Sequence, residues 1–281
     1  MISKNLRILL LAALTAWGAT GAAAQDQASH DGMVEYGFIA GGLSYPPYPG
    51  ATGQKNRFLI LPYLKYNSQR FSIGNGSIAA VHLSETSRTR LDISIAGSFD
   101  ASSAGVPARV GMPDLDYIFE AGPVVEYQMG TFLGATAEAR LPLRAVFTTN
   151  LKTLKGIGAT FSPQLRLTWT LNKETRTEVE ATLQPVFATE GVQDYFYQVD
   201  PAYVTLSRPA YNALGGYMGT ELVVKLSHSI SPTLRVYGYA KIGMNGGAVN
   251  RTSPLFGSNR TVTLGIAVRK TLGFWDMNKY W

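Results

Sequence analysis

The sequence contains no cysteine and only three histidines, and both shortages restrict its chemistry. Without cysteine, a disulfide-stabilised secreted scaffold and cysteine-based metal or redox sites are excluded. The histidines form no close cluster with carboxylates, so we expect no metal site and no cofactor. After its first two dozen residues the chain also lacks any apolar run near the ~18 residues of a membrane-spanning helix, which excludes a helical membrane protein.

The first 24 residues have the pattern of a secretory signal peptide. Lys4 and Arg7 precede an apolar run over residues 8–17, and small residues follow at 21–24. The run is too short to anchor the chain across ~30 Å of hydrocarbon. We therefore expect residues 1–24 to be cleaved and residues 25–281 to form one domain. Removal of Lys4 and Arg7 lowers the net charge from +6 to about +4. A net charge of this size does not predict a nucleic-acid partner.

Apolar residues recur at every second position in several long segments. In 164–172, Leu165, Leu167, Trp169 and Leu171 alternate with polar residues, and 90–100, 178–184, 233–244 and 262–268 repeat the pattern. This period predicts β-strands with one apolar and one polar face. A soluble β-sandwich would show the same alternation with its apolar face inward.

Three features favour the membrane over the sandwich. The segments are about 10–18 residues long, as tilted bilayer crossings require, and their polar faces carry charges of both signs. Aromatic residues near segment ends fit interfacial girdles. They are Tyr36, Tyr45, Tyr63, Tyr66, Tyr127, Phe147, Trp169 and Phe187. We therefore predict an all-β fold, a closed antiparallel transmembrane β-barrel in the outer membrane of a Gram-negative bacterium, in contact with outer-membrane lipid.

Eleven segments qualify as strands, whereas single-chain bacterial barrels have an even number. They are 32–44, 57–67, 70–83, 89–100, 115–129, 132–149, 153–172, 176–189, 211–228, 232–245 and 261–272. Gly74-Asn75-Gly76 is a hairpin signal that can divide 70–83 into two short strands. We predict about twelve strands, with ten as the alternative. Short turns at 129–131, 172–175 and 229–232 should be periplasmic, and longer links at 100–115, 190–210 and 245–261 external.

Charged residues occupy the predicted inner face of the barrel. A charged lining is typical of a solute-selective pore. The same charges could instead fill a narrow lumen as ion pairs, and the predicted size favours neither alternative. The candidate lumen residues are Arg90, Asp92, Glu126, Glu138, Arg140, Arg144, Arg166, Glu178, Glu180, Glu221, Lys225, Arg235 and Lys241.

The link 190–210 is long and rich in residues that anchor binding interfaces. The candidate binding residues in and beside it are Asp194, Tyr195, Phe196, Tyr197, Arg208 and Tyr211. The alternative is a lid that folds back over the barrel and packs its own aromatic side chains.

His82-Leu83-Ser84 has the spacing that places a base and a nucleophile on one face of a strand, as a barrel lipid hydrolase requires. Because side chains alternate between the two faces of a strand, the side chains of His82 and Ser84 should both point into the lumen, away from lipid. The asparagine that such hydrolases carry just after the serine is absent. We therefore expect no enzymatic activity, with a lipid hydrolase as the weakest alternative.

Several motifs in a fixed order carry a family resemblance. The most specific is the spaced set of Asp194-Tyr195-Phe196-Tyr197-Gln198-Val199, Arg208-Pro209-Ala210-Tyr211 and Gly215-Gly216. Segments 41–50, 61–63 and 253–255 are weaker matches. Together they resemble the MltA-interacting protein (MipA/OmpV) family over nearly all of the mature chain. The chain departs from the family where residues 273–281 follow the last expected strand.

The resemblance implies an outer-membrane barrel, and its name-giving member is similar to a scaffold between a lytic transglycosylase and a peptidoglycan synthase. A murein hydrolase and a murein synthase are thus the expected partners, bound at periplasmic turns. Other members are described as adhesion, osmotic-response or drug-response barrels, and a fold alone does not determine function. The main alternative is a small-solute outer-membrane channel.

Overall fold

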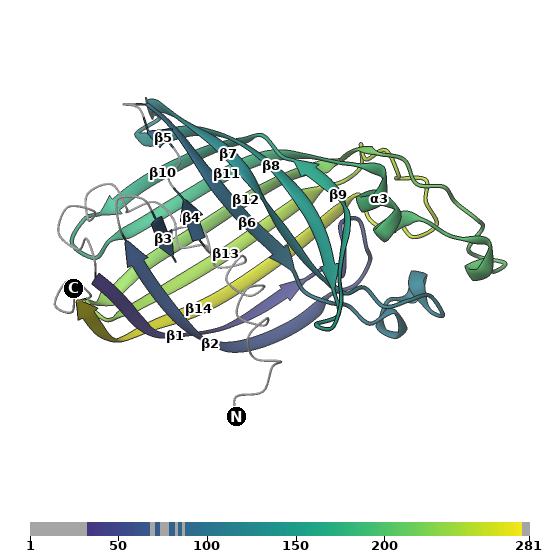
Figure 1. The fold of residues 1–281 in the computed structure, drawn as a ribbon, viewed down its shortest axis with the longest axis horizontal. Coiled ribbons are helices and arrows are strands. Elements are labelled where there is room, and N and C mark those ends of the chain that lie inside the picture. Colours follow the sequence, from purple (N-terminus) through teal and green to yellow (C-terminus); the bar gives the residue numbers. More distant parts are fainter. Residues whose placement is uncertain (1–32, 68–70, 74–78, 82–83, 86–87, 277–281) are drawn as a thin grey trace.

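The computed structural model describes residues 33–67, 71–73, 79–81, 84–85 and 88–276, which form one antiparallel sheet rolled around an axis (Figure 1). The strands are β1 (Met33–Tyr45), β2 (Lys55–Asn67), β3 (Phe71–Ile73), β4 (Ala79–Val81), β5 (Ser84–Glu85), β6 (Thr89–Ser98), β7 (Tyr117–Phe132), β8 (Ala135–Thr149), β9 (Leu154–Phe161), β10 (Gln164–Asn172), β11 (Thr177–Ala188), β12 (Gly216–Ser231), β13 (Leu234–Met244) and β14 (Arg260–Asp276). The connections contain the helix α3 (Glu190–Tyr197) and the 3₁₀ turns η2 (Ser103–Gly105), η3 (Pro107–Arg109) and η4 (Pro201–Tyr203).

The strand order closes the sheet into a barrel. It runs β4-β3-β2-β1-β14-β13-β12-β11-β10-β8-β7-β6-β5, and β9 pairs with β8 and β11 beside β10. The two ends of this order, β4 and β5, are only two residues apart in the chain. The short segment that contains β4 and β5 therefore completes the barrel, because β4 pairs with β3 and β5 pairs with β6. Closure satisfies backbone groups that an open edge would leave unpaired in lipid.

The described strands agree with the expected count of about twelve. Because Pro163 has no backbone N–H, it interrupts the ladder, and β9 and β10 are two parts of one crossing. Ten long crossings, the short strand β3 and the short segment that contains β4 and β5 then account for the described sheet. The predicted division of 70–83 is thereby confirmed, although the hairpin signal at 74–76 lies outside the described residues. The signal peptide and the His82-Leu83 positions also lie outside them.

Two strand boundaries differ from the prediction. Residues 211–215 belong to a connection, because β12 begins only at Gly216. β14 continues to Asp276 along β1, with an irregularity in the pairing between Tyr36 and Gly37. Residues 273–276 are therefore strand and extend the last crossing.

The outer face of the barrel is apolar. Phe58, Ile60 and Ile266 expose 65–68% of their surface, because they are turned to the lipid. Of the aromatic residues expected at the interface, Tyr36, Tyr127 and Phe187 are exposed in this way. The prediction is wrong for Tyr45 and Tyr63, which are buried inside the barrel. None of the described residues forms a helix long and apolar enough to cross a membrane.

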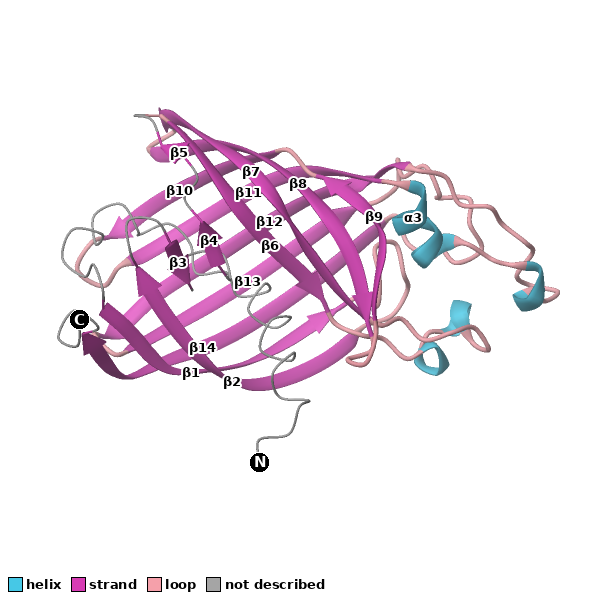
Figure 2. Ribbon diagram, viewed as in Figure 1, coloured by secondary structure: helices cyan, strands magenta, loops and turns pink. Residues whose placement is uncertain are grey.

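The two ends of the barrel have unequal connections (Figure 2). Tight turns at 133–134, 173–176 and 232–233 lie at one end, where Met33 also pairs with Asp276. Long connections at 46–54, 99–116, 189–215 and 245–259 lie at the other end. Bacterial barrels have short turns in the periplasm and long loops outside, so the end with tight turns is periplasmic.

Candidate functional site: a charged lumen beneath a loop cap

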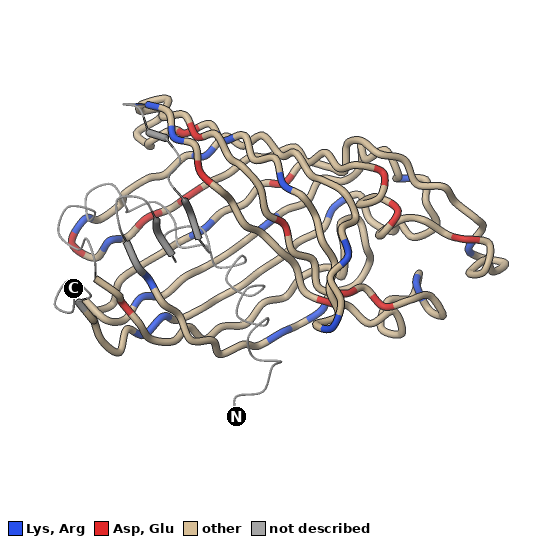
Figure 3. The backbone as a smooth tube through the Cα atoms, viewed as in Figure 1, with Lys and Arg blue, Asp and Glu red and all other residues tan. Residues whose placement is uncertain are grey.

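Figure 3 marks Lys, Arg, Asp and Glu positions along the strands of the barrel. Side chains of opposite sign pair across neighbouring strands. The pairing register places Arg90 opposite Glu126, Glu126 opposite Arg140, and Glu138 opposite Arg166. Opposite charges directly across an antiparallel pair attract. The network formed in this way, called the lumen network here, comprises Arg90, Asp92, Glu126, Glu138, Arg140, Arg166, Glu180 and Lys225.

Glu126 lies at the centre of the network and is 5% exposed. One of its carboxylate oxygens accepts hydrogen bonds from Arg90, and the other lies 2.6 Å from Arg140 Nε. Arg140 also donates to Gln164 Oε1 at 3.0 Å. Two guanidinium groups therefore share one carboxylate in a space with little solvent. In such a space, removal of one partner of an ion pair destabilises the protein by more than formation of the pair stabilises it.

The network continues across the barrel through Arg166. Its Nη1 lies 3.2 Å from Glu138, and its Nε lies 3.5 Å from Glu180. Lys225 Nζ approaches the other oxygen of Glu180 at 3.3 Å. Side chains from β6, β7, β8, β10, β11 and β12 thus line this part of the barrel wall with alternating charge.

Smaller groups flank the network. Arg235 lies 3.3 Å from Glu178, Lys241 lies 2.8 Å from Glu221, and Arg144 lies 3.9 Å from Glu120. With these contacts, each of the thirteen candidate lumen residues takes part in an ion pair.

Sequence reasoning missed three charged members of the lumen. Glu35 accepts hydrogen bonds of 2.6 Å from Tyr63 and Thr271 and lies 3.7 Å from Arg269. Glu120 is the third. The alternation along the last strand could have identified Arg269. Val262, Leu264, Ile266 and Val268 take the outward positions, so residue 269 takes an inward one.

The long connections 46–54, 99–116, 189–215 and 245–259 pack against one another over the outer end of the lumen, and we call them the loop cap. α3 turns Val192, Phe196 and Tyr197 into a common apolar core. The rings of Tyr48 and Phe196 stack with centroids 6.1 Å apart, and Tyr48 meets Tyr197 edge-on at 6.2 Å. The cap therefore has a packed interior of its own.

Buried polar groups hold the connections of the cap together. Asn250 is fully buried and donates to Gln193 Oε1 at 3.0 Å and to the carbonyl of Leu214 at 2.8 Å. The Leu214 N–H donates back to Asn250 Oδ1 at 2.9 Å. Tyr197 donates to the carbonyl of Pro49 at 2.7 Å, and Ser253 donates to the carbonyl of Tyr197 at 2.7 Å. Each such bond joins segments far apart in sequence.

The six candidate binding residues lie in the cap. Phe196, Tyr197 and Arg208 are buried, and Arg208 donates to the carbonyls of Ala108 and Val110 at 3.0 Å. Three others are half-buried: Tyr211 contacts Asn250, Tyr195 contacts the backbone of Asp116, and Asp194 lies on α3. This placement favours the lid alternative over an exposed set of binding anchors.

Burial in the cap changes the acidity of its side chains. It raises the pKa of Tyr48 and of Tyr195 to about 12 and that of Tyr197 further still. Burial also lowers the pKa of Arg109, whose Nη1 donates to the carbonyl of Phe196 at 3.1 Å. The phenols are therefore neutral hydrogen-bond donors at physiological pH. Among the described residues no group of His, Asp or Glu is arranged to hold a metal ion.

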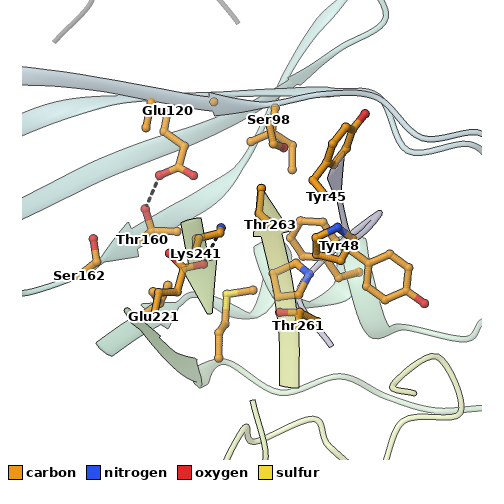
Figure 4. Close-up of a pocket in the computed structure, with 18 of the residues that line it drawn as sticks. Tyr45, Tyr48, Ser98, Glu120, Thr160, Ser162, Glu221, Lys241, Thr261 and Thr263 are labelled. Carbon is orange, nitrogen blue, oxygen red and sulfur yellow. Dashed lines mark hydrogen bonds and ion pairs between the residues drawn. The ribbon is translucent and has the colours of Figure 1, made fainter. Parts of the chain in front are cut away.

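A cavity of about 310 Å³ lies under the cap. Figure 4 shows Glu120, Thr160, Glu221 and Lys241 pointing toward one space, with Tyr48 nearby. Arg144, several polar side chains, and aromatic and aliphatic side chains of the cap and barrel line the rest of the cavity. The cavity can therefore offer both charged and apolar contacts to a small molecule.

Comparison with protein families assigns the chain. Residues 39–272 match the model of the MltA-interacting protein MipA. This chain belongs to the MipA family. With its lipid-facing apolar surface, the MipA-family barrel resides in the outer membrane. No curated protein matches it.

Solved structures resemble this MipA-family barrel only remotely. The NanC porin has 8% identity over 85% of this chain and 100% of its own, with a TM-score of 0.37. OmpT of Vibrio cholerae has 9% identity over 88% and 99% with a TM-score of 0.37. Outer membrane phospholipase A from Escherichia coli has 10% identity over 84% and 92% with a TM-score of 0.35. These likenesses are too weak to support conclusions about activity.

Proposed function

We propose that this MipA-family barrel is a non-conducting, non-enzymatic scaffold that holds a murein hydrolase, and through it a murein synthase, at the periplasmic face of the outer membrane. The observation that supports this most directly is that paired charges line the lumen beneath a packed cap. A solute pore needs a continuous path, whereas here the charged side chains bond to one another. The family description supplies the class of the partner.

The periplasmic turns offer a surface for such a partner. Leu133 at the apex of the β7–β8 turn is 75% exposed and has a φ of +50°. The left-handed region costs a residue with a Cβ roughly 1 kcal/mol or more, so asparagine or glycine usually occupies it. Leucine is unfavourable at a turn position with this φ, and an exposed leucine also lowers solubility. Contact of Leu133 with a partner would account for its presence there.

Neighbouring side chains enlarge this apolar surface. Phe132, next to Leu133, is 56% exposed. Trp169 Nε1 donates to the carbonyl of Leu133 at 3.0 Å, which joins the two hairpins. Because a standard interface buries ~800 Å² per partner, the partner must also contact the turns at 173–176 and 232–233.

Site-specific photocrosslinking in cells tests the proposal. A photoreactive residue at Leu133 should capture a murein hydrolase. The same residue at Leu206, which is fully exposed in the cap, should not. Leu133→Asn should fold at least as well as the wild type, because asparagine suits the turn, yet reduce co-purification of the hydrolase. Equal capture from both positions, or none from Leu133, would contradict the scaffold.

Single-channel recording tests the alternative of a small-solute channel. The purified full-length barrel in a planar bilayer should show no steady conductance. A stable, ion-selective conductance that changes in Lys241→Gln would instead favour the channel, because Lys241 is a candidate lumen residue.

A further inference from the structure

The cavity under the cap has a divided lining. Tyr48 and Phe196 of the cap and Met218 of β12 contribute apolar surface, whereas Glu120 and Arg144 contribute charge from the barrel wall. Its volume of about 310 Å³ is at the lower end of the range of roughly 300–1,000 Å³ that ligand pockets occupy. The space therefore suits a small molecule with one apolar and one charged part.

The charged groups of the cavity are not equally paired. Lys241 and Glu221 are in contact at 2.8 Å, and Glu221 also accepts a hydrogen bond of 2.6 Å from Gln184. Arg144 and Glu120, in contrast, are 3.9 Å apart, beyond hydrogen-bond distance. This separation distinguishes them from the closely bonded pairs around Glu126.

Arg144 and Glu120 are nevertheless held in place. Arg144 Nε donates to Ser94 Oγ at 2.6 Å, and Thr160 Oγ1 donates to Glu120 Oε2 at 2.8 Å. Within the described part of the chain, no hydrogen bond engages the two terminal nitrogens of Arg144. A guanidinium end and a carboxylate, fixed side by side at a cavity, can each bind a ligand group of opposite charge.

We infer that this cavity binds a small zwitterion with an apolar side chain, of the class of free amino acids. The ligand carboxylate would bind the terminal nitrogens of Arg144, and its ammonium group would bind Glu120. Its side chain would then pack against Phe196 and Met218. The charges of the four charged side chains that line the cavity sum to zero. A zwitterion keeps the net charge of the occupied cavity at zero, whereas an anion or a cation leaves an uncompensated charge there. The inference is independent of the scaffold proposal.

Isothermal titration of the full-length barrel in detergent tests the inference with three matched probes. L-Phenylalanine should bind, whereas N-acetylphenylalanine, an anion, and phenylalanine amide, a cation, should bind at least tenfold more weakly. Arg144→Gln should weaken phenylalanine binding at least tenfold. Ala96→Phe, which places a ring in the cavity without changing its charge, should have the same effect.

Lys225→Gln is the matched control, because it removes a lumen cation that does not line the cavity. It should keep the affinity of the wild type. The shift in gel mobility between heated and unheated samples establishes that each variant is folded. Absence of phenylalanine binding to the wild type would overturn the inference. So would preferred binding of N-acetylphenylalanine, or equal losses in Arg144→Gln and Lys225→Gln.

Discussion

Replacing Glu126 by glutamine removes the carboxylate on which the guanidinium groups of Arg90 and Arg140 converge. Glutamine keeps nearly the same volume, so packing changes little and the effect is electrostatic. Breaking a buried ion pair by removing one partner costs ~3–5 kcal/mol, because the remaining charge is left without compensation. Arg90 retains Asp92 at 3.0 Å, and Arg140 retains Gln164, so the lower end of this range applies. We expect a loss of about 3 kcal/mol in the free energy of unfolding.

The assay is urea-induced unfolding of the barrel in lipid vesicles, monitored by tryptophan fluorescence. Glu174→Gln, in the exposed β10–β11 turn, is the matched control and should change the free energy by no more than about 0.5 kcal/mol. A double variant with Arg140→Gln should lose less than the sum of the single variants, because the unpaired guanidinium is removed as well. A loss below about 1 kcal/mol for Glu126→Gln would refute the assigned role of the network.

Three further predictions concern the cap and the lipid face. Burial raises the pKa of Tyr48 from 10 to about 12, so the unfolded state loses this proton first. The contribution of Tyr48 to cap stability is complete below pH 10 and falls by roughly 1.4 kcal/mol per pH unit up to pH 12. Hydrogen exchange of the cap should therefore show a pH dependence that is smaller by this amount in Tyr48→Phe, with Tyr195 and Tyr197 supplying the rest. Asn250→Leu leaves buried partners without hydrogen bonds, so limited proteolysis should cleave the cap faster while the barrel stays intact. Ile266→Arg should lower the stability of the folded barrel in vesicles by ~2–4 kcal/mol if its position is near the bilayer centre, whereas Leu206→Arg in the cap should have no measurable effect.

The barrel and the facing of its charges were predictable because alternation is a local pattern. Where one face is apolar throughout, as in β10 and β13, parity alone indicates which side chains point inward. β2 shows where this reasoning fails. Leu59, Leu61 and Tyr63 lie on its inner face and Ile60 and Leu64 on its outer face, so apolar residues occupy both faces. The facing of Tyr63 could not be predicted from such a strand.

The cap could not be predicted in detail, because its contacts join distant segments. The hydroxyl of Tyr48 donates to the carbonyl of Leu255, and Arg208 donates to the carbonyl of Ala108. No local periodicity predicts which connection meets which. The sequence indicated only that the connection 190–210 is long and rich in aromatic residues, a pattern that fits both a binding loop and a lid. Burial of Phe196 and Tyr197 favours the lid.

The balance of charge in the lumen indicates how the barrel is used. A selectivity lining usually presents one sign of charge in rings, so that ions of the other sign are attracted. Among the described residues, the ion pairs of the lumen, including those of Glu35, Glu120 and Arg269, contain eight cations and eight anions. Such a lining attracts neither sign of charge over a long path. This balance of charge supports the proposed scaffold over the alternative of an ion-selective channel.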